Sequence, residues 1–450
     1  MKNIINEVTG IFTKKSKHAA LFTLMTAATI AGSQASYAAL DLELTQGISG
    51  GIPIAIVPFQ GQTANDASSN NLATVISNDL RYSGRFKVMD FAAMEQQPNA
   101  LSQVNYGYWK KNAIDNLVIG KALSHGSQYQ VDYSLLDIFK GADGSALSTE
   151  EFKTDQANLR RLAHHISDQI YKQLTGDKGV FSTHIVYVLV ERAKNKPARY
   201  SLVVADVDGY NPKTIVVSSE PMMSPAWSPD GKRVAYVSFE QNHAAIYVVN
   251  VQNGARQLVT NFPGINGAPA WAPDGQRLAV VLSKDGHPNI YVANLQSKGL
   301  QQITQGSSID TEPNWAPDGK SIIFTSDRGG SPQIYRTSLS NPGVAERLTF
   351  NGKYNARASF SADGKSIVML HQSPEGYSIA MQDLQNKGFT ILTKSGLDTS
   401  PSLAPNGKLV LYGTNFSGHG VLGVVSSDGR VKLRLPAREG DVLGPAWGPF

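Results

Sequence analysis

The chain has 450 residues, of which 41% are hydrophobic and 17% charged, with 41 glycines, 22 prolines and no cysteine. Its length predicts at least two domains, and its low charge with abundant glycine and proline favours a turn-rich β protein over a disordered or coiled-coil one. Because cysteine is absent, the sequence excludes a disulfide framework, a zinc ribbon, an iron–sulfur site and a thiol nucleophile.

Residues 1 to 38 have the pattern of a cleaved export signal. Three lysines precede an apolar stretch from Ala19 to Ala31, and Ser36 and Ala38 stand in the register of an Ala-x-Ala cleavage site. The apolar stretch is short for a membrane anchor, the less favoured alternative, so we expect no integral membrane segment after processing. These residues carry a net charge of +3, which leaves +2 of the chain's +5 and removes the case for a nucleic-acid partner.

Residues 51 to 178 predict a small domain with a mixed α/β sheet, preceded by a short segment at 39 to 50. Strands are expected at 52–59, 86–89, 116–121, 128–139 and 146–154, and helices at 71–82, 109–114 and 159–174. In the first helix, Leu72, Val75, Ile76, Asp79 and Leu80 recur at helical spacing. The stretch 175–179 ends the last helix and is the expected domain boundary.

Residues 179 to 450 contain a repeat of 43 to 45 residues. Such a period, with an aromatic residue, a Pro-Asp-Gly turn and short apolar strands, is typical of a β-propeller blade with four strands. Pro-Asp-Gly supplies a fixed φ, a side-chain acceptor and a positive-φ residue, which together make a tight reversal. The repeats open at Trp227, Trp271, Trp315, Phe360, Leu403 and Trp447.

The count of strands predicts how the propeller closes. Strands at 185–189, 201–205 and 213–217 precede Trp227 and lack an inner strand of their own. We expect residues 444–447 to supply it, so that the N- and C-terminal strands of the propeller domain join in one blade of a six-bladed ring. A linear solenoid is the alternative, but it would leave both incomplete ends unpaired.

The residues that precede each opening aromatic differ between repeats and should ring one mouth of the central channel. Most of these side chains are small or polar, and two of them carry opposite charges, which suits a surface that docks a protein or peptide. The alternative is that they are loop residues whose identity varies without functional meaning. The ring consists of Met223, Ser224, Gly267, Ala268, Thr311, Glu312, Ala356, Arg357, Thr399, Ser400, Leu443 and Gly444.

Catalytic and metal-binding motifs lack a supporting context. The Gly-x-Ser-x-Gly match at 47–51 lies before a strand, whereas a nucleophile elbow follows one. The nine histidines show no metal-ligand spacing, His164 and His165 point to different helix faces, and Asp206-Val-Asp-Gly209 predicts a hairpin turn rather than a calcium loop. We expect no enzyme, no metal ligand and no cofactor, while an ion in the propeller channel stays an open question.

The phrase Pro-Met-Met-Ser-Pro-Ala-Trp-Ser-Pro-Asp-Gly at 221–231 resembles the TolB family of the Tol-Pal system of Gram-negative envelopes. Further matching stretches lie in both predicted domains and in the same order, at 52–59, 79–81, 174–176, 266–270, 311–313, 324–327, 402–407, 427–430 and 435–437. The resemblance covers the whole chain after the signal and implies a non-enzymatic periplasmic protein.

In this family the propeller mouth binds the lipoprotein Pal. Many relatives carry His-Asn-Gly-Ala where this chain has Ile265-Asn-Gly-Ala268, which replaces a polar side chain by an apolar one. By the resemblance, the Pal-binding residues would be Met223, Ser224, Asn266, Gly267, Ala268, Thr311, Glu312, Arg357, Asp398 and Thr399.

The resemblance also implies that the mature N-terminus binds the C-terminal domain of the inner-membrane protein TolA. Leu40, Leu42 and Leu44 alternate with polar residues, which suits strand addition to a partner's sheet edge; a frayed terminus is the alternative. The TolA-binding segment would comprise Ala39, Leu40, Asp41, Leu42, Glu43, Leu44, Thr45, Gln46 and Gly47.

The implied function is to link outer-membrane Pal to TolA, in support of outer-membrane integrity and of envelope constriction during cell division. Other outer-membrane lipoproteins and imported bacteriocins are further partners to consider, and we expect a monomer. The alternatives are an exported propeller hydrolase, which would need channel-lining metal ligands, and a sensor of cell-wall glycans, which would need exposed aromatic side chains at the mouth.

Overall fold

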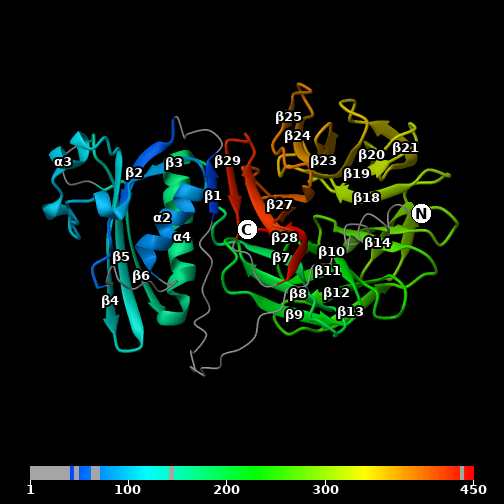
Figure 1. Ribbon diagram of the computed structural model, residues 1–450, viewed down its shortest axis with the longest axis horizontal. Helices are drawn as coiled ribbons and strands as arrows, with labels where there is room; N and C mark the ends of the chain where they lie inside the picture. The colour runs from blue at the N-terminus through cyan, green and yellow to red at the C-terminus, as the bar shows by residue number, and fades with distance from the viewer. Residues whose placement is uncertain (1–40, 45–49, 62–70, 141–145, 436–439) are drawn as a thin grey trace, which may run out of the picture. The chain divides into compact units, whose positions relative to one another are not determined.

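The computed structural model contains a small α/β domain followed by a six-bladed β-propeller (Figure 1). It describes residues 41–44, 50–61, 71–140, 146–435 and 440–450, and for 41–44 the backbone alone. The predicted signal at 1–38 and most of the Gly-x-Ser-x-Gly match lie outside the described residues. Within the described part of the chain, no helix is both long and apolar enough to cross a membrane.

The α/β domain has one five-stranded mixed sheet in the order β3-β2-β4-β5-β6. Strand β2 (Ile52–Ile56) lies between β3 (Phe86–Val88) and β4 (Asn116–His125) and runs parallel to both. Strands β5 (Gln128–Asp137) and β6 (Ser148–Asp155) extend the sheet in antiparallel fashion. Strand β4 is four residues longer than the prediction because it pairs with β5 as far as His125.

Helices cover both faces of this sheet. On one face, α2 (Leu72–Tyr82) and α4 (Leu159–Thr175) contribute to the core that β2, β4 and β5 build. The side chain of Asn71 accepts the Thr74 N–H at 3.1 Å and so caps the start of α2. On the other face, α3 (Tyr106–Lys111) buries Trp109.

Several other boundaries also differ from the sequence prediction, and two of them have a clear local cause. Helix α3 ends at Lys111 rather than at 114, because Ala113 adopts a φ of 54°, which cannot continue a right-handed helix. Strand β5 ends at Asp137, whose carboxylate accepts the N–H groups of Phe139 and Lys140 at 2.9 and 3.1 Å and so turns the chain. Short 3-10 turns occupy 91–93, 101–103 and 156–158.

The propeller blades are antiparallel sheets of four strands, numbered here from the inner strand outward. The first three blades are β30 (Asp441–Trp447), β7 (His184–Glu191), β8 (Arg199–Asp206) and β9 (Lys213–Ser218); β10 (Met222–Trp227), β11 (Arg233–Ser238), β12 (Ala245–Asn250) and β13 (Arg256–Thr260); and β14 (Asn266–Trp271), β15 (Arg277–Leu282), β16 (Asn289–Asn294) and β17 (Leu300–Gln302).

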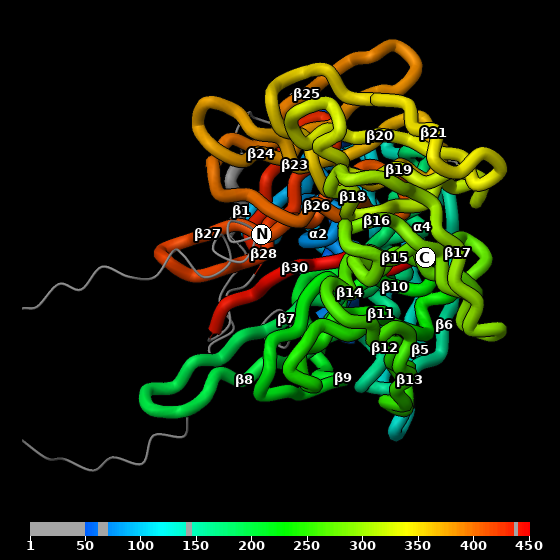
Figure 2. The backbone as a smooth tube through the Cα atoms, turned by 90° about the vertical axis from the view of Figure 1, so that its right-hand side faces the viewer, coloured from blue at the N-terminus to red at the C-terminus, as the bar shows by residue number. Residues whose placement is uncertain are grey.

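The remaining blades are β18 (Asp310–Trp315), β19 (Ser321–Ser326), β20 (Gln333–Ser338) and β21 (Asn341–Arg347); β22 (Asn355–Phe360), β23 (Ser366–Ser373), β24 (Gly376–Asp383) and β25 (Phe389–Ile391); and β26 (Thr399–Leu403), β27 (Leu409–Phe416), β28 (His419–Ser426) and β29 (Val431–Arg434). The backbone of β1 (Asp41–Leu44) adds a fifth strand outside β29. Figure 2 shows inner strands arranged about the centre of the ring.

The ring closes as the sequence predicts. Strand β30, at the C-terminal end, pairs antiparallel with β7, with Leu443 opposite Val188 and Trp447 opposite Ile185. The Trp447 N–H also donates to Ser402 Oγ of the neighbouring blade at 2.9 Å. The first and last strands of the propeller therefore meet in one sheet, and the solenoid alternative is wrong.

The repeated tryptophan joins one blade to the next. Trp271 Nε1 donates to the carbonyl of Ala226 at 3.0 Å, and Trp315 Nε1 donates to the carbonyl of Ala270 at 3.1 Å. The guanidinium of Arg233 lies 4.6 Å from the Trp271 ring centroid, a cation–π contact across the same boundary. The repeated residues thus form contacts between blades as well as turns within them.

Candidate protein-binding surfaces

Each inner strand of the propeller carries a β-bulge at the end that forms the predicted mouth. The pairing of every inner strand with its neighbour shifts register at this point, and one residue there has a φ between 45° and 54°. Five of the six are not glycine, although the left-handed region is unfavourable for residues with a Cβ. The six are Ser224, Ala268, Glu312, Arg357, Ser400 and Gly444.

These bulges coincide with half of the ring that the sequence predicts, and the other half directly precedes them. A bulge redirects side chains at the end of a strand. Strained backbone that recurs at one position of all six blades must be held by the surrounding fold, and such strain clusters at functional sites. The mouth is therefore a candidate binding surface on structural grounds that are independent of the sequence repeat.

Buried polar side chains hold the loops that lead into the mouth. Asn266 donates to the carbonyl of Phe262 at 2.6 Å, and Asn355, the first residue of β22, donates to that of Asn351 at 2.7 Å. Asp398 accepts a hydrogen bond from Ser395 Oγ. Asn266 and Asp398, which the family resemblance places among the partner contacts, are thus buried, and their side chains support the loops beneath the surface.

Exposed apolar side chains rim the mouth. Ile265 and Ile309 lie directly before an inner strand, Leu397 lies two residues before one, and Met223 and Leu443 lie within one. Their exposed fractions run from 36% to 54%. Large apolar side chains gathered on one exposed surface are typical of a protein interface. Ile265, the departure from many relatives, contributes to this apolar rim.

An ion pair links two neighbouring blades at the mouth. Arg357 Nε donates to Glu312 Oε1 at 2.6 Å, and Arg357 Nη1 donates to Ser400 Oγ at 2.6 Å, which reaches a third blade. The negative charge of Glu312 raises the pKa of Arg357 above its already high usual value. The predicted charged pair is thus a bonded pair, and Arg357 spans three consecutive bulges.

The N-terminal segment pairs with the propeller. Asp41 lies opposite Arg434 and Leu44 opposite Val431, so β1 runs antiparallel along the outer edge of β29. The remaining residues of the predicted TolA-binding segment, 39, 40 and 45–47, lie outside the described residues. In this structure, part of the segment therefore forms its backbone hydrogen bonds with a strand of the same chain.

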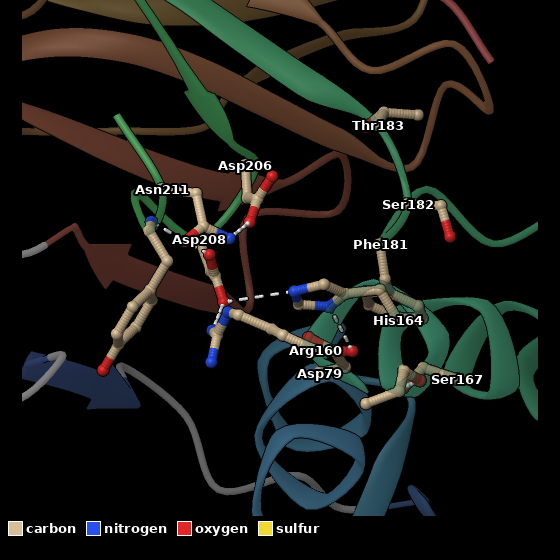
Figure 3. Close-up of polar contacts among 12 residues, drawn as sticks. Asp79, Arg160, His164, Ser167, Phe181, Ser182, Thr183, Asp206, Asp208 and Asn211 are labelled. Carbon is tan, nitrogen blue, oxygen red and sulfur yellow. Dashed lines mark hydrogen bonds and ion pairs between the residues drawn. The ribbon is translucent and has the colours of Figure 1, made fainter. Parts of the chain in front are cut away.

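A second buried polar cluster lies where the α/β domain meets the propeller (Figure 3). His164 Nδ1 of α4 lies 2.8 Å from Asp79 Oδ2 of α2, and His164 Nε2 lies 3.6 Å from Asp208 Oδ2 in the turn after β8. Arg160 of α4 also bonds to Asp208. Two carboxylates and two basic side chains thus join two helices to one turn of the propeller.

The charges of this cluster control the protonation of its histidine. Burial lowers the pKa of His164, but the charges of Asp79 and Asp208 and the hydrogen bond to Asp79 outweigh burial and raise the pKa to about 9. His164 is therefore protonated at neutral pH and balances the carboxylates.

The same cluster brings three potential metal ligands within 4.8 Å of one another. Arg160 already supplies a positive charge to Asp208, and a guanidinium at that carboxylate opposes a metal cation. We therefore interpret Asp79, His164, Asp208 and Arg160 as an ion-pair cluster. The expectation that Asp206–Gly209 forms a hairpin turn is confirmed, with the Gly209 N–H donating to the carbonyl of Asp206 at 2.8 Å.

The linker between the domains is also fixed to α4. The carboxylate of Asp168 accepts the N–H groups of Phe181 and Ser182 at 2.8 and 3.1 Å. Burial raises the pKa of Asp168, although the hydrogen bonds that it accepts act in the opposite direction. Sequence reasoning missed this junction; its one signal was Asp79, a charged residue on the apolar side of a predicted helix.

Comparison with known proteins identifies both halves of the chain. A family model described as the TolB amino-terminal domain matches residues 40–143, and one described as the TolB beta propeller domain matches residues 171–450. The latter spans more than half of the chain.

Individual relatives agree with these matches. The Tol-Pal system protein TolB of Coxiella burnetii is 54% identical over 417 residues, which cover 92% of this chain and 95% of the relative. The same protein of Legionella pneumophila (strain Corby) is 53% identical over 412 residues, with 92% and 95% covered. The crystal structure of TolB from Acinetobacter baumannii is 40% identical, with a TM-score of 0.83, over 92% of this chain and 100% of that chain. The chain belongs to the TolB family of the Tol-Pal system.

Proposed function

We propose that this protein is a non-enzymatic periplasmic component of the Tol-Pal system that links the lipoprotein Pal, at the propeller mouth, to TolA, at its N-terminal segment. Membership of the TolB family supports the Tol-Pal role. In this role the protein supports outer-membrane integrity and the constriction of the envelope during cell division. The export signal predicted at residues 1–38 supports the periplasmic location.

The mouth with its six bulges is the observation that supports a docking role most directly. It combines preorganised backbone, exposed apolar side chains and an oriented ion pair, and tight protein interfaces combine buried apolar anchors with a few oriented polar groups. Thr311 and Thr399, one residue before a bulge in β18 and β26, add hydroxyl groups to this surface.

The N-terminal segment supplies the second docking site. Strand addition to TolA requires free backbone N–H and C=O groups, whereas β1 uses such groups in its pairing with β29. Release of β1 would therefore precede or accompany TolA binding. If Pal at the mouth shifts this release, each partner changes the affinity of the other by the same factor.

Isothermal titration calorimetry of the processed chain tests both parts. We expect Pal to bind the wild-type chain and Glu312→Lys to weaken that binding without a loss of fold. We also expect the affinity for the TolA C-terminal domain to differ with and without saturating Pal. Equal TolA affinities would remove the coupling, and absence of Pal binding would remove the proposed function of the mouth.

A further inference from the structure

We propose that Arg357 recognises a carboxylate of the partner that docks at the propeller mouth, and that Glu312 is a positioning residue which holds Arg357 for this contact. The inference rests on the proposed function, because it names the chemistry by which the mouth selects its partner. It assigns different roles to two residues that the family resemblance treats alike.

Glu312 has its carboxylate oxygens occupied within the protein. Oε1 accepts from Arg357 Nε at 2.6 Å, and Oε2 accepts from the Arg357 backbone N–H at 3.0 Å and from Thr325 Oγ1 at 2.9 Å. A carboxylate with three such donors is already well satisfied and gains little from a donor on a partner. Glu312 therefore acts on the mouth through Arg357.

Arg357 has donors to spare. A guanidinium carries five N–H groups, of which Nε is used by Glu312 and one on Nη1 by Ser400. Among the described residues, Nη2 makes no hydrogen bond. The Arg357 side chain is 46% exposed against 22% for Glu312, so the cation rather than the carboxylate faces an incoming partner.

The geometry fits a carboxylate ligand. The planar guanidinium fork matches the two oxygens of a carboxylate, and a charge-assisted contact of this kind is roughly twice as strong as a neutral hydrogen bond. Bonds to two neighbouring blades fix the orientation of the fork before the partner arrives, which lowers the entropic cost of binding. Apolar side chains of the rim would shield the contact from water and strengthen it.

One hairpin on the mouth side of the propeller adds positive charge to this region. The β7–β8 hairpin extends away from the ring (Figure 2) and carries Lys194 and Lys196 at its exposed tip. Arg192 of this hairpin bonds to Asp441 at the mouth end of β30, which places the hairpin beside the mouth.

A double-mutant cycle separates the two roles. Calorimetry with the soluble domain of Pal should show at least about tenfold weaker binding for Arg357→Ala, because a hydrogen bond to a charged group is lost. Arg357→Lys, which keeps the charge but loses the fork, should recover only part of this affinity. Glu312→Gln should weaken binding in the wild-type background and have no further effect in the Arg357→Ala background.

An ion pair between Arg256 of the outer strand β13 and Glu240 of the β11–β12 turn controls for loss of charge. Arg256 and Glu240 lie 2.8 Å apart with similar exposure, 31% and 30%, and Arg256→Ala with Glu240→Gln should leave the affinity unchanged. Circular dichroism melting curves verify that each variant folds. Unchanged binding by Arg357→Ala, with a wild-type chain that binds Pal, would overturn this inference alone. If Glu312→Gln weakened Pal binding as much in the Arg357→Ala background as in the wild type, the positioning role would be overturned. A wild-type chain that does not bind Pal would overturn the proposed function as well.

Discussion

His164 Nδ1 lies 2.8 Å from Asp79 Oδ2 and joins α4 to α2, while the other side of the imidazole faces Asp208 of the propeller. One protonated side chain thus stabilises negative charge from both domains. Because all of these groups are buried, the folded state depends on their mutual compensation.

Removal of Asp79 should destabilise the protein strongly. Asp79→Ala leaves the buried imidazole without its closest anion, and loss of one member of a buried pair costs on the order of 3 kcal/mol in the free energy of unfolding. Urea unfolding followed by circular dichroism measures the change. Asp90→Ala is the control, because Asp90 is paired with Arg81 but its side chain is 80% exposed, and it should cost less than about 1 kcal/mol. Equal costs for the two variants would contradict the importance of the buried cluster.

Alkaline pH should weaken the fold through His164. Its pKa is raised in the folded protein from 6.5 to about 9, so the histidine holds its proton more tightly when folded. This contribution is fully present below pH 6.5 and is lost as the pH rises through 9, by up to roughly 3 kcal/mol. Unfolding free energies measured from pH 6 to 9.5 should fall in the wild type. His164→Gln should remove this part of the decline, and an unchanged slope would contradict the assignment.

Gly444→Ala tests the backbone strain at the mouth. An added Cβ has room, with Pro225 Cδ nearest at 3.6 Å, but the φ of 53° disfavours any residue with a Cβ. We expect a loss of about 1 kcal/mol, since the left-handed cost exceeds the gain from a stiffer unfolded chain. Gly267→Ala is the matched control at an ordinary φ, with its nearest contact at 3.7 Å, and should be neutral or slightly stabilising in thermal melts.

Trp315→Phe tests the contact between blades. It removes the hydrogen bond from Nε1 to the Ala270 carbonyl and leaves that carbonyl without this donor. Trp227 Nε1 is buried with no hydrogen-bond partner among the described residues, so Trp227→Phe loses packing but no such bond. Chemical denaturation should show Trp315→Phe to be about 1 kcal/mol more destabilising than Trp227→Phe. A larger loss for Trp227→Phe would argue against a stabilising role of the Trp315 hydrogen bond between blades.

The blades were predictable because a similar turn and, in most of them, an aromatic residue recur at a fixed period, so that weak local signals reinforce one another. The bulges were not. Glycine occupies the left-handed position in one blade only, at Gly444, and Ser224, Ala268, Glu312, Arg357 and Ser400 carry no local signal for a positive φ. Tertiary packing imposes the left-handed conformation at these positions, and the periodicity of the sequence carries no information about that packing.

The junction between the domains was hidden for a different reason. Asp79 and His164 are 85 positions apart, and their contact depends on how α2 and α4 pack together. Asp208 contacts them from a turn that the sequence predicts, but the sequence does not predict that this turn contacts the helices. A charged residue at a buried helical position is a sign that a partner exists, but it does not name that partner.

Closure through β30 makes folding of the propeller contingent on the completion of synthesis. Strand β7 emerges first among the propeller strands, yet its inner neighbour is the last strand of the chain to be made. Until then one blade lacks its inner strand and the ring has two unpaired edges, which are prone to incorrect association. A chain that ends before β30 would therefore leave these strand edges open to proteases, so only a chain that includes β30 can form the closed, protected ring.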